Sequence, residues 1–143
     1  MIRTLCLALA ALLSAAFASA QQSEMFGRYE LHYSVVNTTF LEPRVAASYG
    51  ITRGKNRGIL NLAVREHVDG GTEARPMLLQ GYTRDLITGQ PLEFLEVRES
   101  GAIYYIAEFD FINEEWRFFD IDFRPEGSDT TFRFEHRHQL YIN

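Results

Sequence analysis

The sequence predicts an all-β fold, an antiparallel immunoglobulin-like sandwich of about seven strands with one short helix. Apolar and polar residues alternate at every second position over most of the chain, which is typical of strands with one buried face. Clusters of Gly, Pro, Asn and Asp separate these segments, and no helical pattern exceeds about two turns. The many Phe, Tyr, Val and Ile residues favour two packed sheets over an α/β layout. A small barrel is the competing architecture.

The alternation defines each strand in turn. It is clearest in the first one, where Tyr29, Leu31, Tyr33 and Val35 fall on one face and the polar residues Arg28, Glu30, His32 and Ser34 on the other. We expect strands at residues 29–35, 60–68, 76–82, 92–97, 103–111, 116–123 and 130–141. We expect turns at residues 69–71, 88–91, 100–101, 113–115 and 125–129, where Gly, Pro, Asn or Asp gather.

Residues 42–50 break the strand pattern and predict a short helix. Pro43 stands where a first helical turn tolerates proline, and Gly50 where helices commonly end. Val45, Ala46 and Tyr49 would share one side and could cover an open end of the sandwich. A lid over a ligand site is the alternative.

The first 20 residues have the features of a secretory leader. Arg3 precedes an apolar run over residues 5–13, and Ala18-Ser19-Ala20 is a typical cleavage signal. We therefore expect export through the Sec pathway, cleavage after Ala20, and one sandwich domain over residues 21–143 in the periplasm. No later segment approaches the roughly 20 apolar residues of a membrane span, so we expect no transmembrane segment in the mature chain.

Charge and cysteine content narrow the function classes. The only cysteine, Cys6, lies in the leader, so the mature domain depends on its apolar core rather than on disulfides. The formal net charge is −5, and loss of Arg3 makes the mature chain more negative still. Nucleic acid is therefore excluded as an expected partner, because binding it needs several clustered cations.

Several short motifs resemble one bacterial family. They are Asn37-Thr38-Thr39-Phe40-Leu41, Pro43, Val45-Ala46, Tyr49, Arg53, Ile103-Tyr104-Tyr105-Ile106-Ala107 and Pro125. With these residues the mature chain resembles the bacterial domain-of-unknown-function family 4426 over nearly its whole length. The resemblance implies a small exported bacterial protein and supplies no established activity, substrate or catalytic residue.

We expect residues 103–123 to form a hairpin. The pairing register of its two strands determines whether its carboxylates gather on one face. In one pairing register of the two strands, carboxylates lie among aromatic side chains. If the register shifts by one residue, Phe109 faces Phe119 and the apolar residues of both strands share one face. The opposite face then gathers Glu108, Asp110, Asp120 and Asp122. Such carboxylates could bind Ca²⁺, raise one pKa for a hydrolase, or pair with arginine, which is the commonest arrangement on solvated sheets.

His136 and His138 are candidate metal ligands. Residues two apart on a strand point the same way, so both imidazoles could bind one ion. A closed site needs further ligands, and His32 and His67 are the only other histidines, with no spacing that predicts their approach. The alternative is that both histidines lie at the surface or the rim of the sandwich and bind no metal.

The turn at residues 53–58 is a candidate anion-binding loop. Three cations, Arg53, Lys55 and Arg57, and two glycines fall within these six residues. Glycines let backbone N–H groups converge, as suits a phosphate or carboxylate. A solvated hairpin turn is the simpler interpretation. Tyr104, out of phase with the core-facing Tyr105, could add an exposed aromatic contact for a partner or a sugar ring.

No motif for nucleophilic or metalloprotease catalysis is present. The mature chain lacks cysteine, a Gly-x-Ser-x-Gly turn and a His-Glu-x-x-His helix, so we assign no catalytic residue and no cofactor. We expect a monomeric or weakly associating binding or accessory protein that contacts an envelope protein or an anionic envelope component. A metal-binding protein and a carboxylate-based hydrolase are the alternatives.

Overall fold

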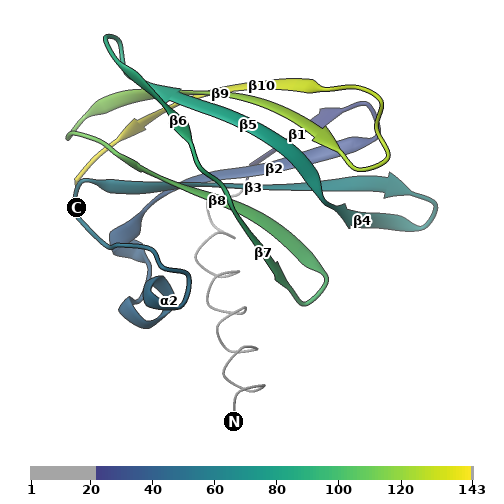
Figure 1. The fold of residues 1–143 in the computed structure, drawn as a ribbon, viewed down its shortest axis with the longest axis horizontal. Coiled ribbons are helices and arrows are strands. Elements are labelled where there is room, and N and C mark those ends of the chain that lie inside the picture. Colours follow the sequence, from purple (N-terminus) through teal and green to yellow (C-terminus); the bar gives the residue numbers. More distant parts are fainter. Residues whose placement is uncertain (1–21, 143) are drawn as a thin grey trace.

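A computed structural model describes residues 22–142, where two antiparallel sheets pack face to face (Figure 1). The predicted leader and its cleavage point after Ala20 lie outside the described residues. The all-β sandwich is confirmed, and the described strands form two separate sheets rather than a closed barrel. No helix within residues 22–142 is long and apolar enough to cross a membrane.

The first sheet has the order β1-β2-β3-β8-β7, with β4 paired to one end of β3. Its strands are β1 (Gln22–Phe26), β2 (Tyr29–Asn37), β3 (Arg57–Val68), β4 (Gly71–Arg75), β7 (Leu95–Glu99) and β8 (Ala102–Asp110). The second sheet has the order β10-β9-β5-β6. Its strands are β5 (Met77–Arg84), β6 (Gly89–Leu92), β9 (Glu115–Pro125) and β10 (Phe132–Leu140).

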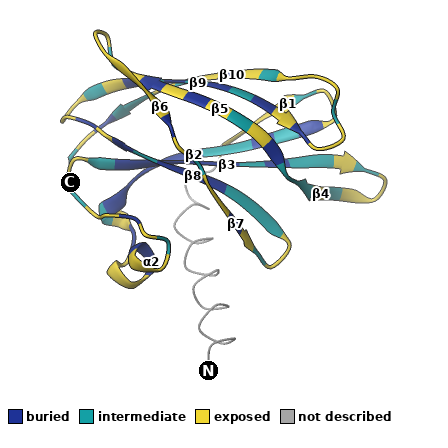
Figure 2. Ribbon diagram, viewed as in Figure 1, coloured by how far each residue is buried: buried dark blue, intermediate teal, exposed yellow. Residues whose placement is uncertain are grey.

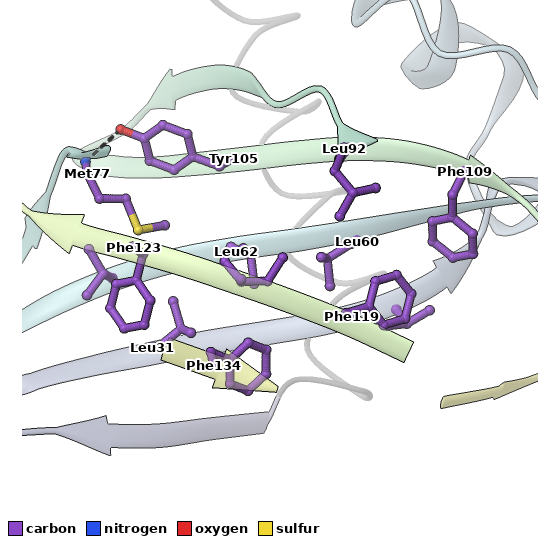
Figure 3. Close-up of a cluster of buried hydrophobic side chains, with 14 of the residues drawn as sticks. Leu31, Leu60, Leu62, Met77, Leu92, Tyr105, Phe109, Phe119, Phe123 and Phe134 are labelled. Carbon is purple, nitrogen blue, oxygen red and sulfur yellow. Dashed lines mark hydrogen bonds between the residues drawn. The ribbon is translucent and has the colours of Figure 1, made fainter. Parts of the chain in front are cut away.

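The main core lies between the two sheets and is rich in aromatic rings (Figure 3). Phe119, Phe123 and Phe134 of the second sheet are fully buried. Phe109 of the first sheet meets Phe119 edge to face, with ring centroids 5.2 Å apart. Burial of each such side chain stabilises the fold by roughly 1.5–3 kcal/mol, so the core needs no disulfide.

The predicted helix forms as α2 (Pro43–Ser48), after a short 3-10 turn η1 (Thr38–Phe40). It does not close an open end of the sandwich as predicted. Val45 and Ala46 are buried in a second cluster on the outer face of the first sheet, with Ile59 and Ile106. Figure 2 shows that α2 has both buried and exposed positions. β3 and β8 carry apolar residues at both odd and even positions, whose side chains point to opposite faces of the sheet. The centre of this sheet is therefore buried on both faces.

The predicted hairpin over residues 103–123 is wrong. β8 pairs with β3 and β7 in the first sheet, whereas β9 pairs with β5 and β10 in the second. The chain crosses between the sheets at residues 111–114, so Phe109 and Phe119 meet across the core and not along a ladder. Period-two alternation marks the buried face of a strand but not its partner, which is why the pattern misled.

The strand boundaries need three further corrections. The strand expected at 92–97 is split between β6 and β7, which belong to different sheets. Residues 89–91, expected in a turn, belong to β6. The strands β1 and β4 were not predicted because most of their residues are polar and none is buried, as is common at sheet edges.

Candidate functional site

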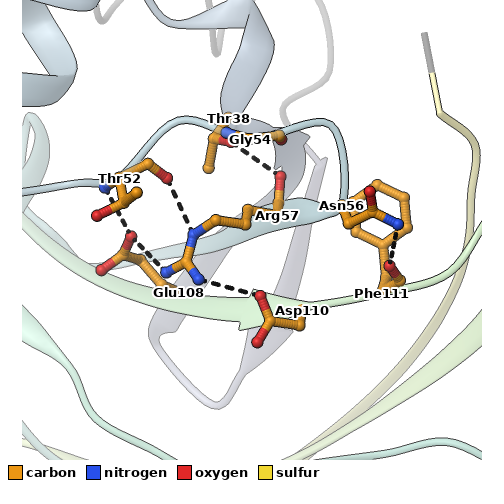
Figure 4. A network of polar contacts seen from close by, with 8 residues as sticks. All are labelled: Thr38, Thr52, Gly54, Asn56, Arg57, Glu108, Asp110 and Phe111. Carbon is orange, nitrogen blue, oxygen red and sulfur yellow. Dashed lines mark hydrogen bonds and ion pairs between the residues drawn. The ribbon is translucent and has the colours of Figure 1, made fainter.

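Hydrogen bonds hold the backbone of the basic loop, which connects α2 to β3, in place (Figure 4). The buried hydroxyl of Thr38 lies 3.0 Å from the carbonyl oxygens of Gly54 and Arg57 and also accepts the N–H of Gly54. Asn56 adds a bond from its side-chain amide to the carbonyl oxygen of Phe111 at 3.2 Å. The loop is therefore fixed against both η1 and the end of β8.

Arg57, predicted to lie in the turn, is instead the first residue of β3, and it anchors the loop rather than standing as a free cation. Its guanidinium lies 3.1 Å from Glu108 and 3.0 Å from Asp110, and its Nε donates to the carbonyl of Thr52 at 3.0 Å. The N–H of Thr52 donates to the same Glu108 carboxylate. Two carboxylates therefore neutralise Arg57, and it has little capacity left for an anionic ligand.

Arg53 and Lys55 remain exposed in the same loop. Arg53 donates to the carbonyl oxygen of Thr39 at 3.1 Å, which orients its guanidinium without neutralising it. Among the described residues, no carboxylate lies within ion-pair distance of Arg53 or Lys55. These two cations are the groups of the loop that a bound anion could reach.

Tyr104 does not join the basic loop. It packs, partly buried, against the cluster beneath α2. Arg57 pairs with Asp110 at the far end of β8, six residues from Tyr104 and so about 20 Å along the strand.

The predicted acidic face does not form, because its members lie on the outer faces of two different sheets. Glu108 and Asp110 belong to the first sheet and meet Arg57. Asp120 and Asp122 belong to the second sheet. The arginines nearest to them are Arg84, 3.3 Å from Asp120, and Arg133, 3.7 Å from Asp120 and 3.3 Å from Asp122. Each of the four carboxylates thus has an arginine partner.

His136 and His138 do lie together, with ring centroids 5.9 Å apart. His136 is partly buried against the ring of Tyr33 across the sandwich, 4.9 Å away. Burial lowers the pKa of His136 to about 4, helped by the neighbouring imidazole, and burial also lowers the pKa of His138. Both rings are therefore neutral at pH 7, the form that binds metals.

The other two histidines form a separate pair that the sequence did not indicate. Glu30 bridges them, 2.7 Å from Nε2 of His67 and 3.4 Å from Nε2 of His32. Hydrogen bonds from Ser23 and His67 lower the pKa of Glu30. Over residues 22–142, no three His, Cys, Asp or Glu side chains are arranged to hold a metal ion.

A cavity of about 650 Å³ is a second feature absent from the sequence predictions. Tyr105 lies on its wall, where the phenol donates to Glu96 at 2.6 Å and accepts the N–H of Met77 at 3.0 Å. Burial, together with the hydrogen bond to Glu96, raises the pKa of Tyr105 to about 12. The hydroxyl therefore stays protonated and serves as a structural bridge.

A family model described as "Domain of unknown function (DUF4426)" matches residues 23–143. The chain belongs to the DUF4426 family. A solved DUF4426 protein from Pseudomonas aeruginosa PAO1 is 31% identical, with a TM-score of 0.74, over 87% of this chain and 98% of that one. The family resemblance drawn from the sequence motifs is thereby confirmed.

FetP of uropathogenic Escherichia coli strain F11 shares the fold. The protein expressed in the E. coli periplasm is 15% identical, with a TM-score of 0.61, over 87% of this chain and 95% of FetP. A copper-bound FetP variant is 14% identical, with a TM-score of 0.60, over 87% and 97%. At these identities the likeness extends to the fold alone. None of the curated proteins matches this chain.

Proposed function

We propose that this DUF4426 protein is an exported periplasmic binding or accessory protein that contacts an anionic envelope component through Arg53 and Lys55. The observation that carries the proposal is the contrast within one loop. Thr38 and Arg57 fix its backbone, whereas Arg53 and Lys55 extend into solvent without a carboxylate partner. A rigid loop with free cations loses little conformational entropy when an anion binds.

Periplasmic location is part of the proposal. The leader-like residues 1–20 support it. The fold is also shared with FetP, a protein produced in the periplasm.

The chemistry of the loop favours phosphate or carboxylate groups displayed on a polymer or a surface. Arginine pairs with them through two parallel N–H bonds, and lysine acts as a point charge. The chain as a whole is acidic, with a formal charge of −5, so an anion gains attraction only close to the loop. Binding should accordingly be local and should weaken as salt is added.

Titration with inorganic polyphosphate, followed by calorimetry, tests the proposal. We expect R53A/K55A to weaken binding about tenfold or more, as two charge contacts of up to ~1 kcal/mol each are lost. R124A is the matched control, since Arg124 is exposed on β9 at the other end of the sandwich. Equal weakening by R124A, or no binding by the parent protein, would refute the proposal.

Metal binding by His136 and His138 is a second candidate function, favoured by a different observation. The two rings lie side by side, and neither has a hydrogen-bond or ion-pair partner among residues 22–142. Two neutral imidazoles supply half of a four-coordinate site, with solvent or a partner supplying the rest. Binding of copper by FetP, which has the same fold, supports the idea.

Thermal unfolding with added Cu²⁺ or Zn²⁺ tests this second candidate. Either ion should raise the midpoint of the parent protein and of H67Q, but not that of H136Q/H138Q. His67 is the control because it lies on the outer face of the first sheet, away from the pair. A midpoint that no metal shifts, or one that shifts equally in H136Q/H138Q, would rule the site out.

A further inference from the structure

The topology gathers three connecting segments and the residues that follow β10 at one end of the sandwich. Strands β2, β5, β8 and β10 end there, and β3, β6 and β9 begin there (Figure 1). We call this the loop end, formed by residues 38–56, 85–88, 111–114 and 141–142. The side-chain amide of Asn37, the last residue of β2, donates to the carbonyl of Tyr141 at 2.6 Å, and the N–H of Ile142 donates to the side-chain oxygen of Asn113 at 2.9 Å.

The loop end displays large apolar side chains to solvent. They protrude singly or in pairs from separate turns: Ile87 (92% exposed), Leu86 (84%), Ile112 (68%), Phe40 (63%) and Tyr141 (51%). The turns at the opposite end, residues 27–28, 69–70, 100–101 and 126–131, contain none of the exposed large hydrophobic residues. The two ends of the molecule therefore differ in polarity.

The most exposed apolar pair stands on a rigid hairpin tip. The carboxylate of Asp85 accepts the N–H groups of Ile87 at 2.7 Å and Thr88 at 2.6 Å, and the N–H of Asp85 donates to the carbonyl of Thr88 at 2.9 Å. These bonds hold the turn so that Leu86 and Ile87 project outward. A preformed tip gives up little entropy on binding.

The free cations of the basic loop flank these apolar side chains. Arg53 binds the carbonyl of Thr39, the residue next to Phe40. Lys55 precedes Asn56, whose amide binds Phe111, the residue next to Ile112. Three carboxylates also lie at the loop end, namely Glu42, Asp85 and Glu114, and Asp85 is engaged by backbone N–H groups.

We propose that the loop end docks reversibly on an anionic phospholipid bilayer, with Leu86, Ile87, Ile112 and Phe40 entering the boundary between headgroups and acyl chains. A bilayer accepts apolar side chains from separate turns without matching pockets, which a protein partner would have to provide. Headgroup phosphates complement Arg53 and Lys55. This inference rests on the proposed function and identifies its anionic component as phospholipid.

Trp116 supplies a native reporter of docking. It is the only tryptophan of the chain, lies near the start of β9 at the loop end, and is 45% exposed. Transfer of its indole from water toward the interface should shift its fluorescence to shorter wavelength.

The experiment is co-sedimentation of the protein, purified after export with its own leader, with vesicles of phosphatidylcholine alone or mixed with phosphatidylglycerol. We expect binding to the mixed vesicles and a blue shift of tryptophan fluorescence. L86S/I87S should weaken binding about tenfold or more. L78S is the matched control, because Leu78 is 65% exposed on the second sheet away from the loop end, and it should change binding less than about twofold.

The outcomes separate this inference from the proposed function. If neither vesicle binds the parent protein, or if L78S weakens binding as much as L86S/I87S, bilayer docking is wrong. If R53A/K55A abolishes binding while L86S/I87S has no effect, the loop binds anions by charge alone and apolar docking is wrong. If vesicle binding requires Leu86 and Ile87 but polyphosphate binding is insensitive to R53A/K55A, the proposed function fails and docking stands.

Discussion

His136 should make the fold sensitive to acid. Burial lowers its pKa from the ordinary value of 6.5 to about 4, so the native state resists protonation of a ring that the unfolded chain protonates readily. Between these two pKa values the unfolded state binds more protons, and stability therefore falls as the pH falls. The contribution is fully present above pH 6.5 and is lost as the pH falls toward 4.

The size of this effect follows from the two pKa values. Linkage gives a loss of about 2 kcal/mol of unfolding free energy at pH 5 and about 3 kcal/mol at pH 4, relative to pH 7. His138, whose pKa is also lowered by burial, adds a loss in the same direction. For a domain of this size such a loss is a large part of the total stability.

Urea unfolding at pH 7, 5 and 4 measures the effect against a non-titrating variant, H136Q. Carboxylates also titrate in this range and affect both proteins. The informative quantity is therefore the difference between parent and variant in how their unfolding free energy changes with pH. H136Q should lose about 2 kcal/mol less than the parent between pH 7 and pH 5. Equal losses in the two proteins would show that His136 is not buried as a neutral ring.

Three further variants test other parts of the structure by urea unfolding. Gly58→Ala should destabilise by about 1–3 kcal/mol, because the new Cβ would lie 2.5 Å from the ring of Phe109, and an unchanged midpoint would contradict this packing. Tyr105→Phe should cost about 1–3 kcal/mol, since the N–H of Met77 loses its acceptor, and wild-type stability would mean that water or another group replaces it. Arg57→Ala should cost only about 1 kcal/mol, because its ion pairs are partly exposed, but it should also weaken polyphosphate binding by loosening the loop. Unchanged affinity would show that the loop does not depend on Arg57.

The sequence was sufficient for the fold class and for most strands, because burial of one strand face leaves a direct period-two signal. In β2, Leu31 and Val35 are buried in the core as predicted. The helix was also readable, from Pro43 at its start and Gly50 beyond its end. Both signals are local, and local signals survive in a single sequence.

Strand pairing could not be read in the same way. The apolar phases of β8 and β9 agree equally well whether Phe109 and Phe119 are neighbours in a ladder or face each other across a core. A signal for the correct arrangement was present, since Ile59-Leu60 and Tyr105-Ile106 place apolar residues in both phases. Such runs are typical of strands covered on both faces, here by the second sheet and by α2.

The candidate sites depended on this pairing and changed with it. The predicted acidic face was wrong because it depended on a hairpin between β8 and β9, and these strands belong to different sheets. The basic loop survived, but Arg57 became its internal anchor because β3 pairs with the carboxylate-bearing end of β8. The bridge that Glu30 makes between two histidines had no sequence signal, since it joins residues from two strands 37 positions apart.

Amide line broadening in nuclear magnetic resonance spectra is the most direct test of the central claim that one end of the sandwich binds the envelope. Bicelles that contain phosphatidylglycerol should broaden the amides of residues 53–57, 85–88 and 111–114 and leave those of residues 69–70 and 126–131 sharp. Broadening at the opposite turns, or none at the loop end, would contradict the account.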